Sequence, residues 1–148
     1  MKTNQKKISI FFLWVSVAVW LLIAIILSSQ TGEHTGVLSW RIAKFLGTLL
    51  NIAEISMPIF HMGLRKIAHI IVFFILTFLS CNASMKTFVP IRSANNWSMV
   101  VCITISILDE WRKSIIPGRH CSWDEAGLNI IGCILGAALA WLVHRTIK

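Results

Sequence analysis

The sequence predicts an all-α, polytopic integral membrane protein with four transmembrane helices and an interfacial amphipathic helix between the first and the second. Hydrophobic residues make up 56% of the chain and charged residues only 14%, whereas a soluble domain carries roughly a quarter charged residues. The apolar residues gather in segments near the length of about 20 residues that crosses a bilayer as a helix. No segment alternates as a half-buried strand does. We expect one domain, residues 1–148.

The first span is expected at residues 8–27, a stretch of 20 residues without any charge. At about 1.5 Å per residue this helix is about 30 Å long, which matches the hydrocarbon core. Lys2, Lys6 and Lys7 precede it, as in a signal peptide. However, the apolar run is longer than that of a signal, and no small-residue cleavage motif follows it. We therefore expect it to remain as a membrane helix.

An amphipathic segment is expected at about residues 37–55. Arg41, Lys44, Thr48 and Asn51 recur at steps of three and four, and mostly apolar residues fill the positions between them. This spacing places the polar residues on one helix face. Two placements suit the pattern: a helix lying along the membrane surface, or a re-entrant segment that dips into the outer leaflet. We expect the segment to end at Pro58, since proline interrupts a helix.

The second span is expected at residues 62–81, the third at 97–116 and the fourth at 126–143, with a polar loop over residues 82–96. Pro117-Gly118 marks the turn between the last two spans.

The third span carries the most informative residues of the chain. Its apolar part has 12 residues, Trp97 to Leu108, which is about 18 Å of helix and too short to span. Extending the helix to Ile116 places Asp109 and Glu110 inside the membrane. A carboxylate at that depth is costly unless it is paired or faces water, so these residues are functional candidates.

The fourth span begins with a capping-box spacing. Ser122 precedes Glu125 by three residues, so the helix is expected to start near Trp123. Gly132 and Gly136 form a GxxxG step, which allows another helix to pack closely.

Four spans place the end of the first, the start of the second, the end of the third and the start of the fourth at one membrane face. The candidate ligand-binding residues gather there: Gln30, Arg65, Lys66, His69, Asp109, Glu110, Arg119, Asp124 and Asn129. All six acidic residues also lie on this face. The unopposed lysines and arginines of the other face are therefore the better cytoplasmic markers. We expect both termini to be cytoplasmic and the polar end to face outward.

Three functions suit this polar end. In the first, Arg65, Lys66 and Arg119 bind an anionic headgroup or a cell-surface precursor, because guanidinium matches phosphate or carboxylate. In the second, the protein is an enzyme whose general acids and bases come from four candidates: His69, Asp109, Glu110 and Asp124. In the third, pairs between Arg65-Lys66 and Asp109-Glu110 only hold the helices in register.

The chain shows no pattern of a metal, cofactor or nucleic-acid site. It has no HExxH, no His-x-His and no glycine-rich phosphate loop, so we predict neither a metal nor a cofactor. The net charge is +8, but the basic residues flank apolar segments instead of forming one stripe. The expected partners are therefore membrane lipids, with no nucleic acid. The four cysteines are expected to be small apolar fillers.

The polar motifs resemble the signature of the VanZ-like family over nearly the whole chain. The matching residues are Ser28-Ser29-Gln30, Lys66, His69, Asp109-Glu110, Pro117-Gly118-Arg119, Asp124, Asn129, Gly132 and Gly136. Two positions depart: Lys113 stands where the family usually has glutamine, and Phe73 where it commonly has tyrosine.

The resemblance implies a bacterial cell-envelope membrane protein. The founding member is linked to low-level resistance to teicoplanin, a glycopeptide, and glycopeptides act on lipid-linked wall precursors at the outer surface. We therefore expect lowered glycopeptide susceptibility, through an outward-facing polar end that binds or alters a cell-surface component such as a lipid-linked precursor. The alternatives are a membrane enzyme acting on a lipid-linked or phosphate-bearing substrate, and a structural partner of another envelope protein through the Gly132 and Gly136 face.

Overall fold

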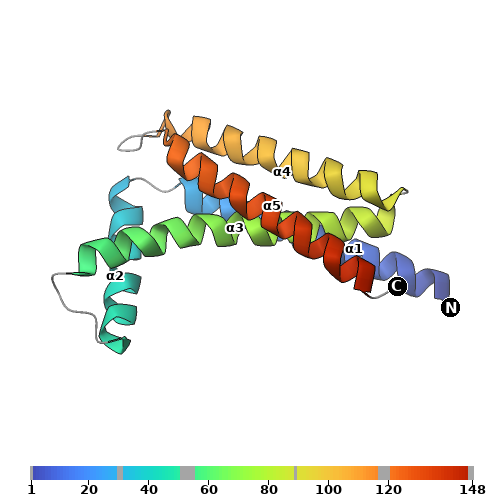
Figure 1. The fold of residues 1–148 in the computed structure, drawn as a ribbon, viewed down its shortest axis with the longest axis horizontal. Helices are drawn as coiled ribbons and strands as arrows, with labels where there is room; N and C mark the ends of the chain where they lie inside the picture. Colours follow the sequence, from blue (N-terminus) through green and yellow to red (C-terminus); the bar gives the residue numbers. More distant parts are fainter. Residues whose placement is uncertain (1, 30–31, 51–55, 89, 117–120, 147–148) are drawn as a thin grey trace.

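The protein is built from five helices in the residues that its computed structural model describes (Figure 1), namely 2–29, 32–50, 56–88, 90–116 and 121–146. The helices are α1 (Lys2–Ser29), α2 (Gly32–Leu49), α3 (Met57–Thr87), α4 (Ile91–Lys113) and α5 (Trp123–Thr146).

Three helices are long and apolar enough to cross a membrane: Lys7–Ser29 in α1, Met57–Thr87 and Trp123–Thr146. They agree with a multi-pass membrane protein. Helix α4 is not among them. Polar and charged residues at both of its ends lower its mean hydropathy: Arg92, Asn95 and Asn96 near the start, and Asp109, Glu110, Arg112 and Lys113 near the end. It nevertheless packs against both α3 and α5, and Figure 1 shows it running along them.

The prediction of a polar loop over residues 82–96 is wrong, because α3 and α4 cover nearly all of this range. Several of its polar side chains form hydrogen bonds within or between the helices. Asn82 Nδ2 donates to the carbonyl oxygen of Phe78 at 2.7 Å, and Ser98 Oγ donates to Ser84 Oγ at 2.6 Å. Ser84 and Ser98 are buried, so these residues pack between α3 and α4.

Helix α2 lies across one end of the bundle, steeply inclined to α3 (Figure 1). Ala43 and Gly47 are buried, and Ser39 Oγ lies 2.7 Å from His61 Nε2 of α3. The helix ends at Leu49, and the rest of the expected amphipathic segment, residues 51–55, lies outside the described residues. The expectation that Pro58 ends this helix is wrong, because Pro58 lies in the first turn of α3, where its missing N–H leaves no hydrogen bond unmade.

Helix α5 meets α3 at the glycine step. A Cβ atom at Gly132 would overlap the carbonyl oxygen of Ile70, and one at Gly136 would overlap that of Phe74. The two backbones therefore lie closer together than any larger residue would permit. Along this contact and that with α4, small side chains fill the core, among them Cys81, Cys102, Cys133, Ala94, Ala137 and Ala140.

Candidate functional site

Charged and polar side chains from α3, α4 and α5 meet at the end of the bundle where α4 ends and α5 begins. The end of α1 and the start of α3 reach the same place, in agreement with the convergence expected from the chain's connectivity. We call the following residues the polar cluster: Arg65, His69, Asp109, Glu110, Arg112, Lys113, Glu125 and Asn129.

Glu110 and Lys113 form a buried ion pair at the centre of the polar cluster. Their side chains are 1% and 3% exposed, and Lys113 Nζ contacts Glu110 Oε1 one helical turn away. The same ammonium lies 3.2 Å from Glu125 Oε2 of α5. A buried charge is costly unless it is paired, so this lysine balances carboxylates from two helices.

His69 and Asn129 extend this network to α3. His69 Nε2 lies 3.2 Å from Glu125 Oε2, and His69 Nδ1 lies 3.1 Å from Asn129 Oδ1. Asn129 is fully buried, and its Nδ2 donates to Glu110 Oε1 at 3.4 Å. Both ring nitrogens of His69 therefore face an acceptor.

Glu125 contacts three basic residues of the polar cluster, and one of them, Arg65, lies at the outer edge of the cluster. Besides His69 and Lys113, Glu125 contacts Arg65, whose Nη2 lies 3.6 Å from Glu125 Oε1. The Arg65 side chain is 40% exposed and that of Glu125 25%. The network thus runs from a buried centre to a guanidinium that reaches the surface.

An ion pair within α4, between Asp109 and Arg112, is hydrogen-bonded to the end of α1. Asp109 accepts hydrogen bonds from Ser28 Oγ at 2.7 Å and from Arg112 Nη2 at 3.1 Å. Arg112 Nη1 also donates to Ser29 Oγ at 2.7 Å. The end of α1 is therefore held against the end of α4 at the polar cluster.

Most of the residues predicted as a site come together, namely Arg65, His69, Asp109, Glu110 and Asn129. Lys66 and Asp124 are exposed, while Gln30 and Arg119 lie outside the described residues. The expected pairing of Arg65-Lys66 with Asp109-Glu110 is wrong. Arg65 pairs with Glu125, and Asp109 and Glu110 pair with basic residues of their own helix.

Glu125 and Lys113 are in the polar cluster but were not among the predicted site residues. The signal for Glu125 was present, since it lies four residues before Asn129 and shares a helix stripe with it. Its capping-box spacing drew attention to the helix end instead. Ser122 Oγ does accept a hydrogen bond from the Glu125 N–H at 3.4 Å, but the Glu125 carboxylate turns toward α3 and α4.

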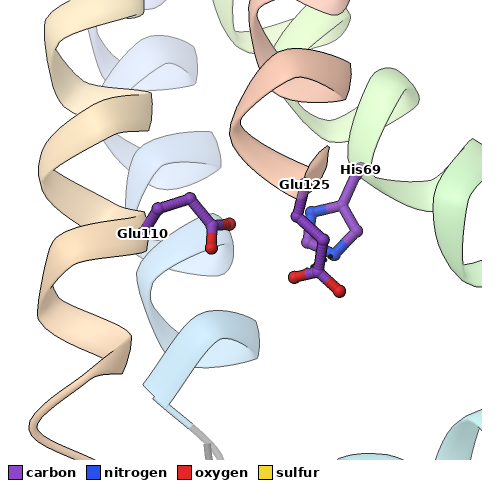
Figure 2. A group of neighbouring side chains, drawn as sticks. All are labelled: His69, Glu110 and Glu125. Atoms are coloured by element: carbon purple, nitrogen blue, oxygen red, sulfur yellow. Dashed lines mark ion pairs between the residues drawn. The ribbon is translucent and has the colours of Figure 1, made fainter. Parts of the chain in front are cut away.

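Three side chains of the polar cluster carry donor atoms suited to a cation. His69, Glu110 and Glu125 each place one such atom within 4.8 Å of the other two. Figure 2 shows the Glu110 carboxylate extending from α4 toward Glu125 of α5 and the His69 ring of α3.

A family model described as VanZ/LLP1 matches residues 11–144, nearly the whole chain. No curated protein and no solved structure matches the chain.

Proposed function

The chain belongs to the VanZ/LLP1 family, and on this basis we propose that it lowers susceptibility to glycopeptide antibiotics such as teicoplanin, by binding or altering a cell-surface component at the polar cluster. The observation that carries the proposal is that Glu110 and Lys113 are buried at the end of α4. Apolar residues at these positions would stabilise the fold as well as the ion pair does, so stability alone does not account for the two charges. Ionisable groups kept inside a membrane helix bundle mark function by default.

Binding is the activity that the polar cluster supports best. Arg65 is partly exposed at the edge of the polar cluster and is held at one side by Glu125. A guanidinium offers several donors in a fixed plane, which suits the phosphate or carboxylate of a lipid headgroup or wall precursor. In this proposal Glu125, Lys113 and Glu110 position the binding surface.

We place α4 as a fourth span, with the polar cluster facing outward and both termini in the cytoplasm. With 23 residues, α4 is about 35 Å long. Near its start Ala94 packs with Ala137 and Ala140 of α5, and near its end Lys113 reaches Glu125 at the start of α5. A helix that accompanies two spans over this length crosses the same bilayer.

We place α2 at the outer membrane interface. Ile42, Phe45 and Leu49 are exposed on one face, and Arg41 and Lys44 on the neighbouring face. A helix across the bundle end with these two faces suits the boundary between headgroups and acyl chains.

A groove between α1, α3 and α4 favours a lipid-linked component. Its volume is about 570 Å³, and its lining includes Trp14, Leu21, Val101 and Ile105. Ile105 lies about one helical turn from Asp109 of the polar cluster. A hydrocarbon chain in this groove would bring its headgroup toward the charged end.

The alternative is an enzyme acting on a lipid-linked or phosphate-bearing substrate, with His69 as its general base. Because both ring nitrogens of His69 face protein acceptors, a substrate could reach Nε2 only by displacing Glu125, and the geometry favours binding. Turnover of a purified lipid precursor by the purified protein would reverse this preference. A partner protein docking on the Gly132 and Gly136 face is disfavoured, because α3 covers that face.

The proposal is tested by the substitutions Arg65→Gln and Glu125→Gln in a glycopeptide-susceptible bacterium that expresses the chain. We expect the minimal inhibitory concentration of teicoplanin to fall to that of cells lacking the protein, while immunoblots show normal protein levels in the membrane. Asp124→Asn is the matched control: it removes a neighbouring but exposed carboxylate, and we expect resistance to persist. Unchanged resistance in both well-expressed cluster variants would contradict the proposal.

A further inference from the structure

We propose that His69, Glu110 and Glu125 form a binding site for a divalent transition-metal ion, and that the Lys113 ammonium competes with the metal for the two carboxylates. The inference concerns the interior of the polar cluster and requires no antibiotic or wall precursor.

The three donor side chains come from three helices. His69 belongs to α3, Glu110 to α4 and Glu125 to α5, and their donor atoms lie within 4.8 Å of one another. Zinc binds imidazole nitrogen and carboxylate oxygen at about 2.0–2.2 Å, which requires donor atoms about 3.3 Å apart in a tetrahedral site. Small side-chain movements would therefore bring them onto one ion, and imidazole with carboxylate suits zinc or a neighbouring first-row metal.

Glu110 supplies an independent observation. Its side chain is 1% exposed, and its Oε2 atom has no hydrogen-bond partner among the described residues. A buried carboxylate oxygen without a partner is unfavourable. Figure 2 shows the Glu110 carboxylate extending from α4 toward Glu125 and His69, so a cation held by these three residues would give this oxygen a partner.

His69 is already oriented as a metal ligand. Histidines that bind metals usually donate their other ring N–H to a fixed acceptor, which sets the tautomer and the ring orientation. The buried Asn129 Oδ1 lies 3.1 Å from His69 Nδ1 and can play this role. Nε2 is then directed at Glu125, 3.2 Å away, and both could bind one ion.

A metal ion can bind at this site only if the Lys113 ammonium leaves it. This ammonium contacts Glu110 Oε1 and lies 3.2 Å from Glu125 Oε2, so one positive charge already sits where a metal would bind the same carboxylates. A divalent ion and this ammonium would repel each other strongly at such a distance. Metal binding therefore requires Lys113 to swing away, and removing its charge strengthens the site.

The experiment is a Zn²⁺ titration of the purified, chelator-treated full chain in detergent, against a competing chromophoric chelator. We expect Lys113→Gln to bind one Zn²⁺ at least about tenfold more tightly than the wild type. Lys113→Arg, which keeps the charge, is expected to bind no more tightly than the wild type. Adding Glu125→Gln to Lys113→Gln should abolish the gain, whereas adding Asp124→Asn, a change at an exposed position, should preserve it.

Equal affinity of Lys113→Gln and the wild type, or a gain that survives Glu125→Gln, would overturn the inference. If Lys113→Gln does not fold even with Zn²⁺ present, Zn²⁺ binding to the wild type tests the inference instead. Saturable binding of one Zn²⁺ that His69→Gln removes supports the site, and no binding at millimolar Zn²⁺ overturns it. The readout is the Zn²⁺ affinity of the purified chain, which is independent of teicoplanin resistance in cells. The metal site can therefore be disproved while the proposed function holds, and the proposed function can be disproved while the metal site holds.

Discussion

Lys113 is the residue on which the buried Glu110 carboxylate depends. Its ammonium is the cation that contacts Glu110, and both side chains are almost fully buried. We expect Lys113→Met in metal-free buffer to lower the free energy of unfolding by roughly 3–5 kcal/mol, because it leaves Glu110 charged and unpaired in the interior. Adding Glu110→Gln removes that charge and should recover much of the loss. Chemical unfolding in mixed micelles measures both.

The matched control is Lys66→Met, which removes an exposed lysine of α3. Its effect should stay within about 0.5 kcal/mol, as for most surface substitutions. An equal loss in Lys66→Met and Lys113→Met would show that burial of the pair contributes nothing.

The helix ends that meet can be predicted from the sequence more reliably than the side chains that face inward. His69, Glu110 and Asn129 were predicted because they lie at the span ends that the connectivity brings to one membrane face. Asp124 was selected although it is exposed, and Glu125 beside it was passed over. Adjacent residues on a helix point about 100° apart, so only the packing of α5 on α3 decides which of the two acids enters the cluster.

At the scale of the elements, the contact between α3 and α5 depends on Gly132. A Cβ there would overlap the backbone of α3 at Ile70, so we expect Gly132→Ala to destabilise the protein by roughly 1–3 kcal/mol through overpacking. Gly127→Ala in the same helix is the control, since nothing lies within 4 Å of its Cβ. Alanine should there be neutral or stabilising by up to about 1 kcal/mol. Thermal unfolding in detergent would show the contrast, and equal melting temperatures would contradict the close contact.

The loop expected between α3 and α4 shows why polar composition misleads within a helix bundle. Asn82 and Ser84, within the expected loop, and Ser98, just after it, are of residue types common in turns of a soluble chain. Here they bond to backbone or to one another while remaining helical or buried. Their surroundings, not their local pattern, decide the outcome, and a single sequence does not contain those surroundings.

For the whole molecule, the meeting of four helix ends follows from connectivity alone, and the sequence therefore predicts it. Membrane placement needs a further argument, because α4 is not apolar enough by composition to count as a span. The four charged residues near its C-terminal end are the ones that form ion pairs in the polar cluster. Helix α4, which its composition does not identify as a span, is therefore the helix that must cross the membrane for our proposed topology to hold.

Cysteine labelling in intact cells tests this topology. Cys121 is partly exposed at the clustered end, whereas Cys81, Cys102 and Cys133 are buried, so we expect a membrane-impermeant maleimide to label Cys121 from outside. In a Cys121→Ser background, Gln5→Cys and Thr146→Cys, at exposed positions near the two termini, should react only after permeabilisation. Four spans place both termini on the same side of the membrane, whereas three would place them on opposite sides. Labelling of only one terminal cysteine in intact cells would therefore show that α4 does not cross, and labelling of both, with Cys121 protected, would show that the polar cluster faces the cytoplasm.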